Sequence, residues 1–300
     1  MIDALRKAVD KRFDDLCELT TLLVREQTLL GHEESAQRLI HKRLTRLGFT
    51  VERVGIDAVD ALADPHGGYP ALSYAGRTNV AGRLTGSEGR GSLHLSGHID
   101  VVPVDGAERW RHDPWGAEVA DGRMWGRGAG DMKAGIAAYL IAVEAFLAVC
   151  GPPKGDLCFS SVIEEECGGN GMRAVLAAGY DAEETLIGEP FWPHLGNGGV
   201  GVIWARLDAQ GSGRHAAQAD EGVAPIEALI DAVGALRELE TEFNASGADP
   251  VFAGAFAHPY NLNLGEIGGG AWPSSVPTDA WLRIRLGFGR DLEPAAVQQL

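Results

Sequence analysis

The sequence predicts a layered α/β domain, with a mixed and partly parallel sheet and helices on both faces, followed by a smaller α+β module. In the first part of the chain, strand-like runs alternate with helix-like runs, which is typical of layered domains. After Gly199 the order becomes strand, helix, strand, strand and the start of a helix. A ferredoxin-like module would need one more strand. We therefore expect two domains, 1–198 and 199–300, both incomplete at residue 300.

The helices of the first domain are predicted by the spacing of apolar residues. Helical spacing runs through Ala4–Val24 and again through Glu34–Leu47. The stretch Met132–Val149 is apolar on nearly every face, which indicates a helix buried in the core rather than one on the surface. A further short helix is expected over Met172–Ala178.

The strands are predicted where β-type residues alternate with polar ones or form short apolar runs between breakers. The stretches Asp57–Tyr74 and Val101–Met124 carry Gly, Pro and Asp and are interpreted as irregular. The strands expected in the first domain are Phe49–Val54, Thr78–Leu84, Ser92–Ser96, Asp156–Ile163 and Glu184–Gly188. The second domain is expected to contain Val200–Leu207, Pro225–Leu239 (helix), Leu262–Ile267, Ala280–Phe288 and the beginning of a helix at Leu292–Leu300.

The composition narrows the classes of partner. The chain has 26 Lys and Arg against 42 Asp and Glu, a formal net charge of −16. That charge argues against nucleic acid and anionic membrane as partners and suits a cationic ligand or a metal, although solubility alone explains most acidic proteins. No stretch approaches the roughly 20 apolar residues of a membrane span, and the N-terminus lacks the apolar run of a signal peptide. We expect a cytoplasmic protein.

The cysteines point to a reducing compartment rather than to a disulfide framework. They form no CxxC pair and show no zinc-ribbon spacing. We interpret them as buried free thiols, with a disulfide or ligand role as the alternative. They are Cys17, Cys150, Cys158 and Cys167.

Residues that can bind a metal follow three of the predicted strands. His98 follows Ser92–Ser96, and Glu166 and Glu189 follow the next two strands of the first domain. Asp131 adds a carboxylate where a helix begins. Taken singly, each has a plainer explanation: a strand-end histidine, a solvated acidic turn, a loop acid. Because reactive groups in such sheets gather just past the strand ends, their order and common location favour a metal site.

Several motifs in this order resemble the di-zinc metallohydrolases, the family that includes acetylornithine deacetylase, succinyl-diaminopimelate desuccinylase, aminoacylase and carboxypeptidase G. The resemblance covers essentially the whole chain. Its motifs are Gly97-His98-Ile99-Asp100, Trp110 with Asp113-Pro114-Trp115, Gly126-Arg127-Gly128 with Asp131-Met132-Lys133, Glu165-Glu166 with Gly168-Gly169, Gly188-Glu189-Pro190, and Gly211 to His215.

The resemblance implies two Zn²⁺ per subunit, with Co²⁺ or Mn²⁺ as alternatives. His98 and Glu189 would bind the first ion and Glu166 the second. Asp131 would bridge both ions. Asp100 would hold the other N–H of the His98 imidazole and fix its tautomer.

The same resemblance assigns the general base to Glu165. This carboxylate would take a proton from the water that attacks an amide carbonyl and then pass it to the departing amine. Glu164 and Glu165 are adjacent and should point in opposite directions on an extended chain, so we expect Glu164 to be structural.

The second domain resembles the lid of that family, which also forms a homodimer. His215 matches a lid histidine that reaches across the dimer interface to the oxyanion, although a loop histidine is more often surface decoration. The family's carboxylate-binding Asn and Arg are replaced here by Ser274 and Gly287. Arg283 and Arg285 lie on the same strand face as Gly287 and could substitute.

The family's last zinc ligand is a histidine in a segment that returns from the lid, whereas this chain ends at Leu300. We interpret the sequence as a fragment rather than as a protein that has lost part of its site. The predicted function is a zinc-dependent amidohydrolase that removes an N-acyl group from an amino acid or small amine. The alternatives are a dipeptidase or carboxypeptidase on the same metals and a truncated, non-catalytic metal-binding protein.

Overall fold

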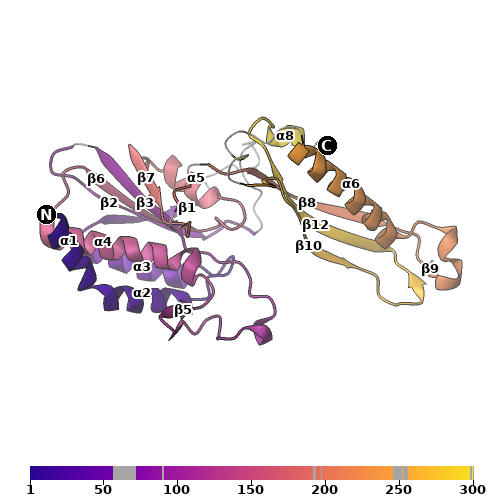
Figure 1. The fold of residues 1–300 in the computed structure, drawn as a ribbon, viewed down its shortest axis with the longest axis horizontal. Helices are drawn as coiled ribbons and strands as arrows, with labels where there is room; N and C mark the ends of the chain where they lie inside the picture. The colour runs from indigo at the N-terminus through magenta and orange to yellow at the C-terminus, as the bar shows by residue number, and fades with distance from the viewer. Residues whose placement is uncertain are drawn as a thin grey trace. The chain divides into compact units, whose positions relative to one another are not determined.

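The computed structural model describes residues 1–56, 72–89, 91–191, 194–196, 198–245, 252, 256–297 and 299. The chain divides into two compact units, Met1–His194 and Leu195–Leu300, and each is described here by itself (Figure 1). Most of the loop predicted over Asp57–Tyr74 lies outside the described residues.

The first unit is built on a mixed, five-stranded sheet whose strands follow one another in the order β1, β2, β6, β3, β7. The three strands β6, β3 and β7 run parallel, whereas β1 and β2 are antiparallel to their neighbours. The predicted mixed and partly parallel sheet is therefore confirmed. The strands are β1 (Thr50–Gly55), β2 (Thr78–Leu84), β3 (Ser92–His98), β6 (Asp156–Val162) and β7 (Glu184–Ile187).

Helices cover both faces of this sheet, as expected for a layered α/β domain (Figure 1). On one face, helices α3 and α4 pack on the strands, because their apolar side chains Leu44 and Ile136 lie against Gly82 and Gly97. On the other face, Met172 of helix α5 contacts the Ser96 hydroxyl. The helices are α1 (Ile2–Asp10), α2 (Phe13–Arg25), α3 (Glu34–Arg46), α4 (Ala134–Cys150) and α5 (Asn170–Ala177).

Helix α4 is the central helix of the first unit. Ile136 and Leu140 are fully buried in the same apolar core as Phe159 of the sheet, and burying each such side chain contributes about 1.5–3 kcal/mol. Contrary to the expectation from sequence, Ala129–Cys150 is long and apolar enough to span a membrane by length and composition. Its packing in this core accounts for that apolar character.

Two local expectations are wrong. The single helix expected over Ala4–Val24 is broken after Asp10, because Arg12 leaves the helical region (φ −107°, ψ 13°) and its guanidinium donates to the Ala8 carbonyl oxygen. The apolar spacing continues across this break and conceals it.

The second error lies in the stretch interpreted as irregular, which contains the hairpin β4 (Glu118–Ala120) and β5 (Arg123–Trp125). Its Asp121-Gly122 turn has positive φ at both residues (53° and 71°), the arrangement of a type I′ turn. This dipeptide was the signal for a hairpin.

The cysteines are all free, as expected, but they are not all buried. Cys158 is buried in β6, whereas Cys150 at the end of α4 is exposed and the other two are intermediate. Cys158 alone among them packs in the apolar core of the first unit.

The second unit has its own three-stranded antiparallel sheet, in the order β10, β12, β8. Helix α6 (Pro225–Ala245) packs on one face, where Leu229 joins Leu282 and Ile284 in a separate core. The order of strand, helix, strand, strand and short helix agrees with the sequence. The elements are β8 (Gly201–Gln210), β9 (Arg214–His215), β10 (Leu262–Gly269), β11 (Ser275–Val276), β12 (Asp279–Phe288) and α8 (Pro294–Val297), with β9 and β11 forming an unpredicted pair.

An apolar groove of about 820 Å³ lies at the amino ends of strands β3, β6 and β7. Leu5, Leu93, Phe146 and Leu186 are among its lining residues. It is therefore at the edge of the sheet opposite to the one at which His98 lies.

Burial of His94 makes the stability of the first unit depend on pH. Its Nε2 lies 2.8 Å from the Ser160 hydroxyl, its side chain is fully buried, and burial together with Arg83 lowers its pKa to about 4. Between its ordinary pKa and 4, only the unfolded chain takes up the proton, so stability falls as pH falls. The full shift corresponds to about 3 kcal/mol.

We expect His94→Gln to lose that part of the pH dependence, measured as the free energy of unfolding between pH 7 and pH 4. The difference between variant and parent is the relevant quantity, because acids elsewhere titrate over the same range. His32→Gln, at an exposed histidine, is the matched control. Equal slopes for parent and His94→Gln would contradict the assignment.

Candidate metal centre

The carboxyl ends of the three parallel strands place the predicted ligands at one edge of the sheet. His98 is the last residue of β3, and Glu189 lies two residues past the end of β7. Glu165 and Glu166 lie in the turn that follows β6. Parallel strands bring their carboxyl ends together, which is why residues far apart in sequence meet here.

Asp131 reaches the same place from the start of helix α4. A Cβ on Gly97 would lie 2.7 Å from Met132 Cε and 2.8 Å from Ile136 Cγ1, so only glycine allows this helix to begin so close to β3. The Asp131–Met132 peptide bond is cis. Asp131 Oδ1 lies 3.0 Å from the Nε2 atom of His98.

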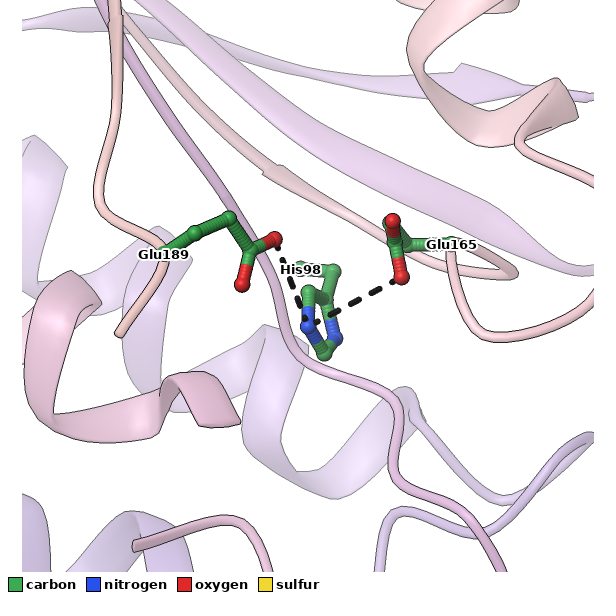
Figure 2. A group of neighbouring side chains, drawn as sticks. All are labelled: His98, Glu165 and Glu189. Atoms are coloured by element: carbon green, nitrogen blue, oxygen red, sulfur yellow. Dashed lines mark ion pairs between the residues drawn. The ribbon is translucent and has the colours of Figure 1, made fainter. Parts of the chain in front are cut away.

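The His98 imidazole is the buried centre of a ring of carboxylates. Figure 2 shows Glu189 and Glu165 on opposite sides of it, with Oε1 of Glu189 3.7 Å and Oε2 of Glu165 3.9 Å from Nε2. The side chain of His98 is 1% exposed, whereas those of Asp131, Glu165 and Glu189 are 56%, 50% and 21% exposed. The centre therefore has a buried base and a rim open to solvent.

Two groups of ligand atoms are close enough to hold an ion. One contains His98, Glu165 and Glu189, and the other contains His98, Asp131 and Glu166, with all ligand atoms of a group within 4.8 Å of one another. The structure thus brings together all four predicted metal ligands. It also places Glu165, predicted as the base, within one of the groups.

The crowding of these acids shifts their pKa values. Burial and the nearby Asp131 raise the pKa of Glu166 to about 7. Burial also raises the pKa of Glu189 to about 7, against the lowering effect of His98 and with a further rise from Glu165. Buried carboxylates this close together are stabilised by a bound cation. Carboxylate and imidazole donors are also the ligands expected at a divalent metal site.

The pKa of the His98 imidazole is also raised, but for a different reason. Burial disfavours its charged form, but the carboxylates of Asp100, Glu165 and Glu189 outweigh burial and raise the pKa above its ordinary value. A bound cation would reverse this balance, since it favours the neutral imidazole as a ligand.

Asp100 takes part in a different way from the one predicted. The Nδ1 atom of His98 lies 2.9 Å from the main-chain oxygen of Asp100, whereas the carboxylate Oδ1 is 3.7 Å away. The carboxylate instead accepts hydrogen bonds from the main-chain N–H groups of Glu165 and Glu166, at 3.3 and 3.1 Å. It is buried, and burial raises its pKa to about 6. Asp100 therefore links His98 to the acidic turn.

Glu164 and Glu165 separate as expected, although not by the expected geometry. Glu164 is fully buried and pairs with Arg77, while Glu165 faces His98. The backbone of Glu164 is not extended but left-handed, with φ 68°. Arg77, Lys133 and Glu33 have no role in the sequence interpretation, because nothing in the spacing of isolated charges shows which of them meet.

Among the described residues, Lys133 has one of the largest side chains that are fully buried. Its side chain is fully buried and Nζ donates to the Glu26 main-chain oxygen at 2.8 Å. Burial lowers its pKa to about 8, against the nearby Glu26 and Asp100. It joins the start of helix α4 to the end of α2 directly beside the metal centre.

The three lid residues predicted to contact substrate all lie in the second unit. His215, in β9, is exposed, and its Nδ1 accepts a hydrogen bond from the Ala217 N–H at 3.2 Å. Arg283 pairs with Glu266 at 3.0 Å. Arg285 is exposed on the same strand face. Their roles stay predictions.

The fold and the cluster together define an α/β protein with an acidic, histidine-containing cluster that could hold a divalent metal. The chain belongs to a known family with this architecture: the family model described as Peptidase family M20/M25/M40 matches residues 94–272. The resemblance seen in the sequence motifs is therefore confirmed.

Curated relatives include two kinds of deacylating enzyme. The N-formyl-4-amino-5-aminomethyl-2-methylpyrimidine deformylase of Bacillus subtilis is 29% identical over 96% of this chain and 66% of its own length. The succinyl-diaminopimelate desuccinylase of Maricaulis maris is 31% identical over 90% of this chain and 64% of its own length. The chain thus spans just under two thirds of the length of these relatives.

Solved structures share the fold at low sequence identity. A di-peptidase of Saccharomyces cerevisiae has a TM-score of 0.74 at 15% identity and covers all of this chain and 74% of its own. Human carnosine dipeptidase 1 has a TM-score of 0.67 at 17% identity, with 100% and 75% covered. A Bacillus subtilis protein described as a dinuclear metal binding peptidase has a TM-score of 0.52 at 16% identity, with 98% and 68% covered.

Proposed function

We propose that this chain is part of a metal-dependent amidohydrolase that removes an N-acyl group from an amino acid or related small amine. The observation that carries the proposal is the convergence of His98 with four carboxylates at the carboxyl edge of the parallel strands. The relatives at about 30% identity act, by their names, on formyl and succinyl groups, which favours a deacylase.

We propose two Zn²⁺ ions as the resident metals, with Co²⁺ or Mn²⁺ as alternatives. His98 and Glu189 would hold one ion, Glu166 the other, and Asp131 would serve both. Oxygen and imidazole donors of this kind suit zinc. When bound, the ions would acidify a water molecule and polarise the scissile carbonyl.

The remaining steps belong to the chain's own side chains. Glu165, half exposed on the rim, would accept the proton of the attacking water and return it to the departing amine. The main-chain oxygen of Asp100 would keep the proton of the His98 ring on Nδ1, which leaves Nε2 free to bind metal.

The second unit is proposed to act as a lid that also forms a homodimer in the cytoplasm. The α6 face of its sheet is covered, and the opposite face presents Arg283 and Arg285 to solvent. Guanidinium groups suit the carboxylate of an N-acyl amino acid, and an imidazole such as that of His215 suits an oxyanion.

A substrate panel tests this function. We expect zinc-loaded protein to hydrolyse N-formyl, N-acetyl or N-succinyl compounds, including the formylated aminopyrimidine and succinyl-diaminopimelate, with kcat/KM at least about tenfold above that for dipeptides (~1.4 kcal/mol). Turnover of dipeptides alone would favour the dipeptidase alternative, which the dipeptidase-like solved structures support. Zinc binding without any hydrolysis would favour a non-catalytic metal-binding protein.

A further inference from the structure

A buried cluster of three charged residues lies behind the acidic turn. Arg77, just before β2, donates from Nη2 to Glu33 Oε1 at 2.6 Å and from Nη1 to Glu164 Oε1 at 3.3 Å. The three side chains, which we call the Arg77 triad, are 9%, 4% and 0% exposed. None of them belongs to either group of candidate metal ligands.

The triad holds a residue whose backbone is strained. Glu164 has φ 68°, the left-handed region that side chains with a Cβ rarely adopt outside turns and functional sites. Its carbonyl oxygen accepts hydrogen bonds from the N–H groups of Gly168 and Gly169, at 3.1 and 2.7 Å. This conformation turns the chain away from β6, so that the next residue, Glu165, faces His98.

The same turn is held from its other sides by neutral and acidic groups. Asp100 accepts from the main-chain N–H groups of Glu165 and Glu166, as described above. Asn79, two residues after Arg77 in the chain, accepts from the Ile163 N–H at 2.9 Å and donates to the Gly171 oxygen at 3.0 Å. The start of β2 therefore clamps both ends of the turn.

The Arg77 triad is not an efficient way to stabilise the fold. One buried cation faces two buried carboxylates, and the Glu164 carboxylate also lies beside the side chains of Tyr74 and Cys167. Buried charge is expensive, and a well-packed apolar residue often stabilises such a place better. What Arg77 does supply is a fixed direction for Glu164, because a guanidinium binds carboxylates in a defined geometry.

We propose that Arg77 is a positioning residue for the metal centre. Through Glu164 it holds the turn in the left-handed conformation that aims Glu165 and Glu166 at the cluster around His98. The inference deepens the proposed function, on which the roles of Glu165 and Glu166 rest, but the mechanical claim concerns the turn itself. It therefore has readouts that need no turnover.

The test compares Arg77→Met with Arg43→Met. Arg43 pairs with Glu144 at 2.8 Å, links α3 to α4, and is also largely buried, but it does not touch the turn. In folded Arg77→Met we expect zinc affinity to fall by about 10- to 100-fold, the loss typical of groups that orient metal ligands. Amide hydrogen exchange at Glu165 and Glu166 in the metal-free chain should also speed up. Arg43→Met should match the parent in both.

Two further variants test the role of Arg77 independently of Arg77→Met alone. If Arg77→Met does not fold, Arg77→Lys keeps the charge but cannot span both acids, and it should show a smaller loss in the same direction. Glycine adopts positive φ without strain, so adding Glu164→Gly to Arg77→Met should restore most of the zinc affinity.

The outcomes separate this proposal from the proposed function. Zinc affinity and exchange in Arg77→Met or Arg77→Lys equal to those of Arg43→Met would overturn the positioning role. Slower turnover with unchanged zinc affinity and unchanged exchange would overturn it as well. If the parent binds zinc but hydrolyses none of the substrates, the deacylase function is wrong. The effect of Arg77 on zinc affinity and hydrogen exchange would still be expected.

Discussion

Replacing Glu165 by Gln is expected to reduce kcat for an N-acyl amino acid by about 10²- to 10⁴-fold, the usual contribution of a general base. The amide keeps the size of the side chain on the rim of the centre but cannot accept a proton. Because Glu165 is assigned to proton transfer rather than to metal binding, the zinc content should stay that of the parent. The measurement is steady-state hydrolysis together with elemental analysis of dialysed protein.

The control for this experiment is Glu108→Gln, an exposed glutamate in the loop between His98 and Asp131, which should behave as the parent. The grouping of Glu165 with His98 and Glu189 supplies the competing explanation, that Glu165 is a ligand. Loss of zinc in Glu165→Gln would support that explanation. Undiminished hydrolysis would rule out both roles.

Replacing Asp131 by Asn is expected to remove metal from the centre. The variant loses the carboxylate that we propose to serve both ions. Zinc affinity should therefore fall by more than about 10- to 100-fold, which is the usual loss when only an outer partner of a metal ligand is removed. In the metal-free protein, the same substitution should not lower stability. Asp131 contributes to the raised pKa of Glu166, so its neutralisation relieves repulsion, and the metal-free variant should be at least as stable as the metal-free parent.

Calorimetric zinc titration and thermal unfolding, each with and without chelator, measure the two effects. Asp105→Asn, at a fully exposed aspartate in the same connecting loop, is the matched control. An Asp131→Asn protein that retained two tightly bound zinc ions would contradict the assignment of the bridging ligand.

The sequence was sufficient to predict the edge of the sheet at which the centre lies. The β-type runs that end at His98, at the acidic turn and before Glu189 are apolar enough to be identified as strands. Because these strands pair in parallel, their carboxyl ends lie at the same edge of the sheet. The bounds of β2 are those predicted. Strand bounds and strand ends depend on local patterns of side chains, and a single sequence is enough to show such patterns.

What could not be predicted depends on contacts between distant residues. The carboxylate of Asp100 binds main-chain groups 65 and 66 residues away, and Arg77 reaches Glu164 across 87 residues. The spacing of apolar and polar residues along the chain does not show which distant residues form such pairs. The left-handed backbone of Glu164 is equally hidden, since the residue is not glycine and the expected acidic turn does not reveal which of its residues has a positive φ.

Each of the two units has an apolar core of its own, so a single melting temperature need not describe the unfolding of this chain. A chain with more than one cooperative unit need not unfold in a single two-state step. The proposed zinc site, His94 and Arg77 all lie in the first unit, whereas Trp204 and Trp281 belong to the sheet of the second unit. Tryptophan fluorescence therefore mixes the two units, and each change in stability has to be assigned to its own unit by a probe placed there.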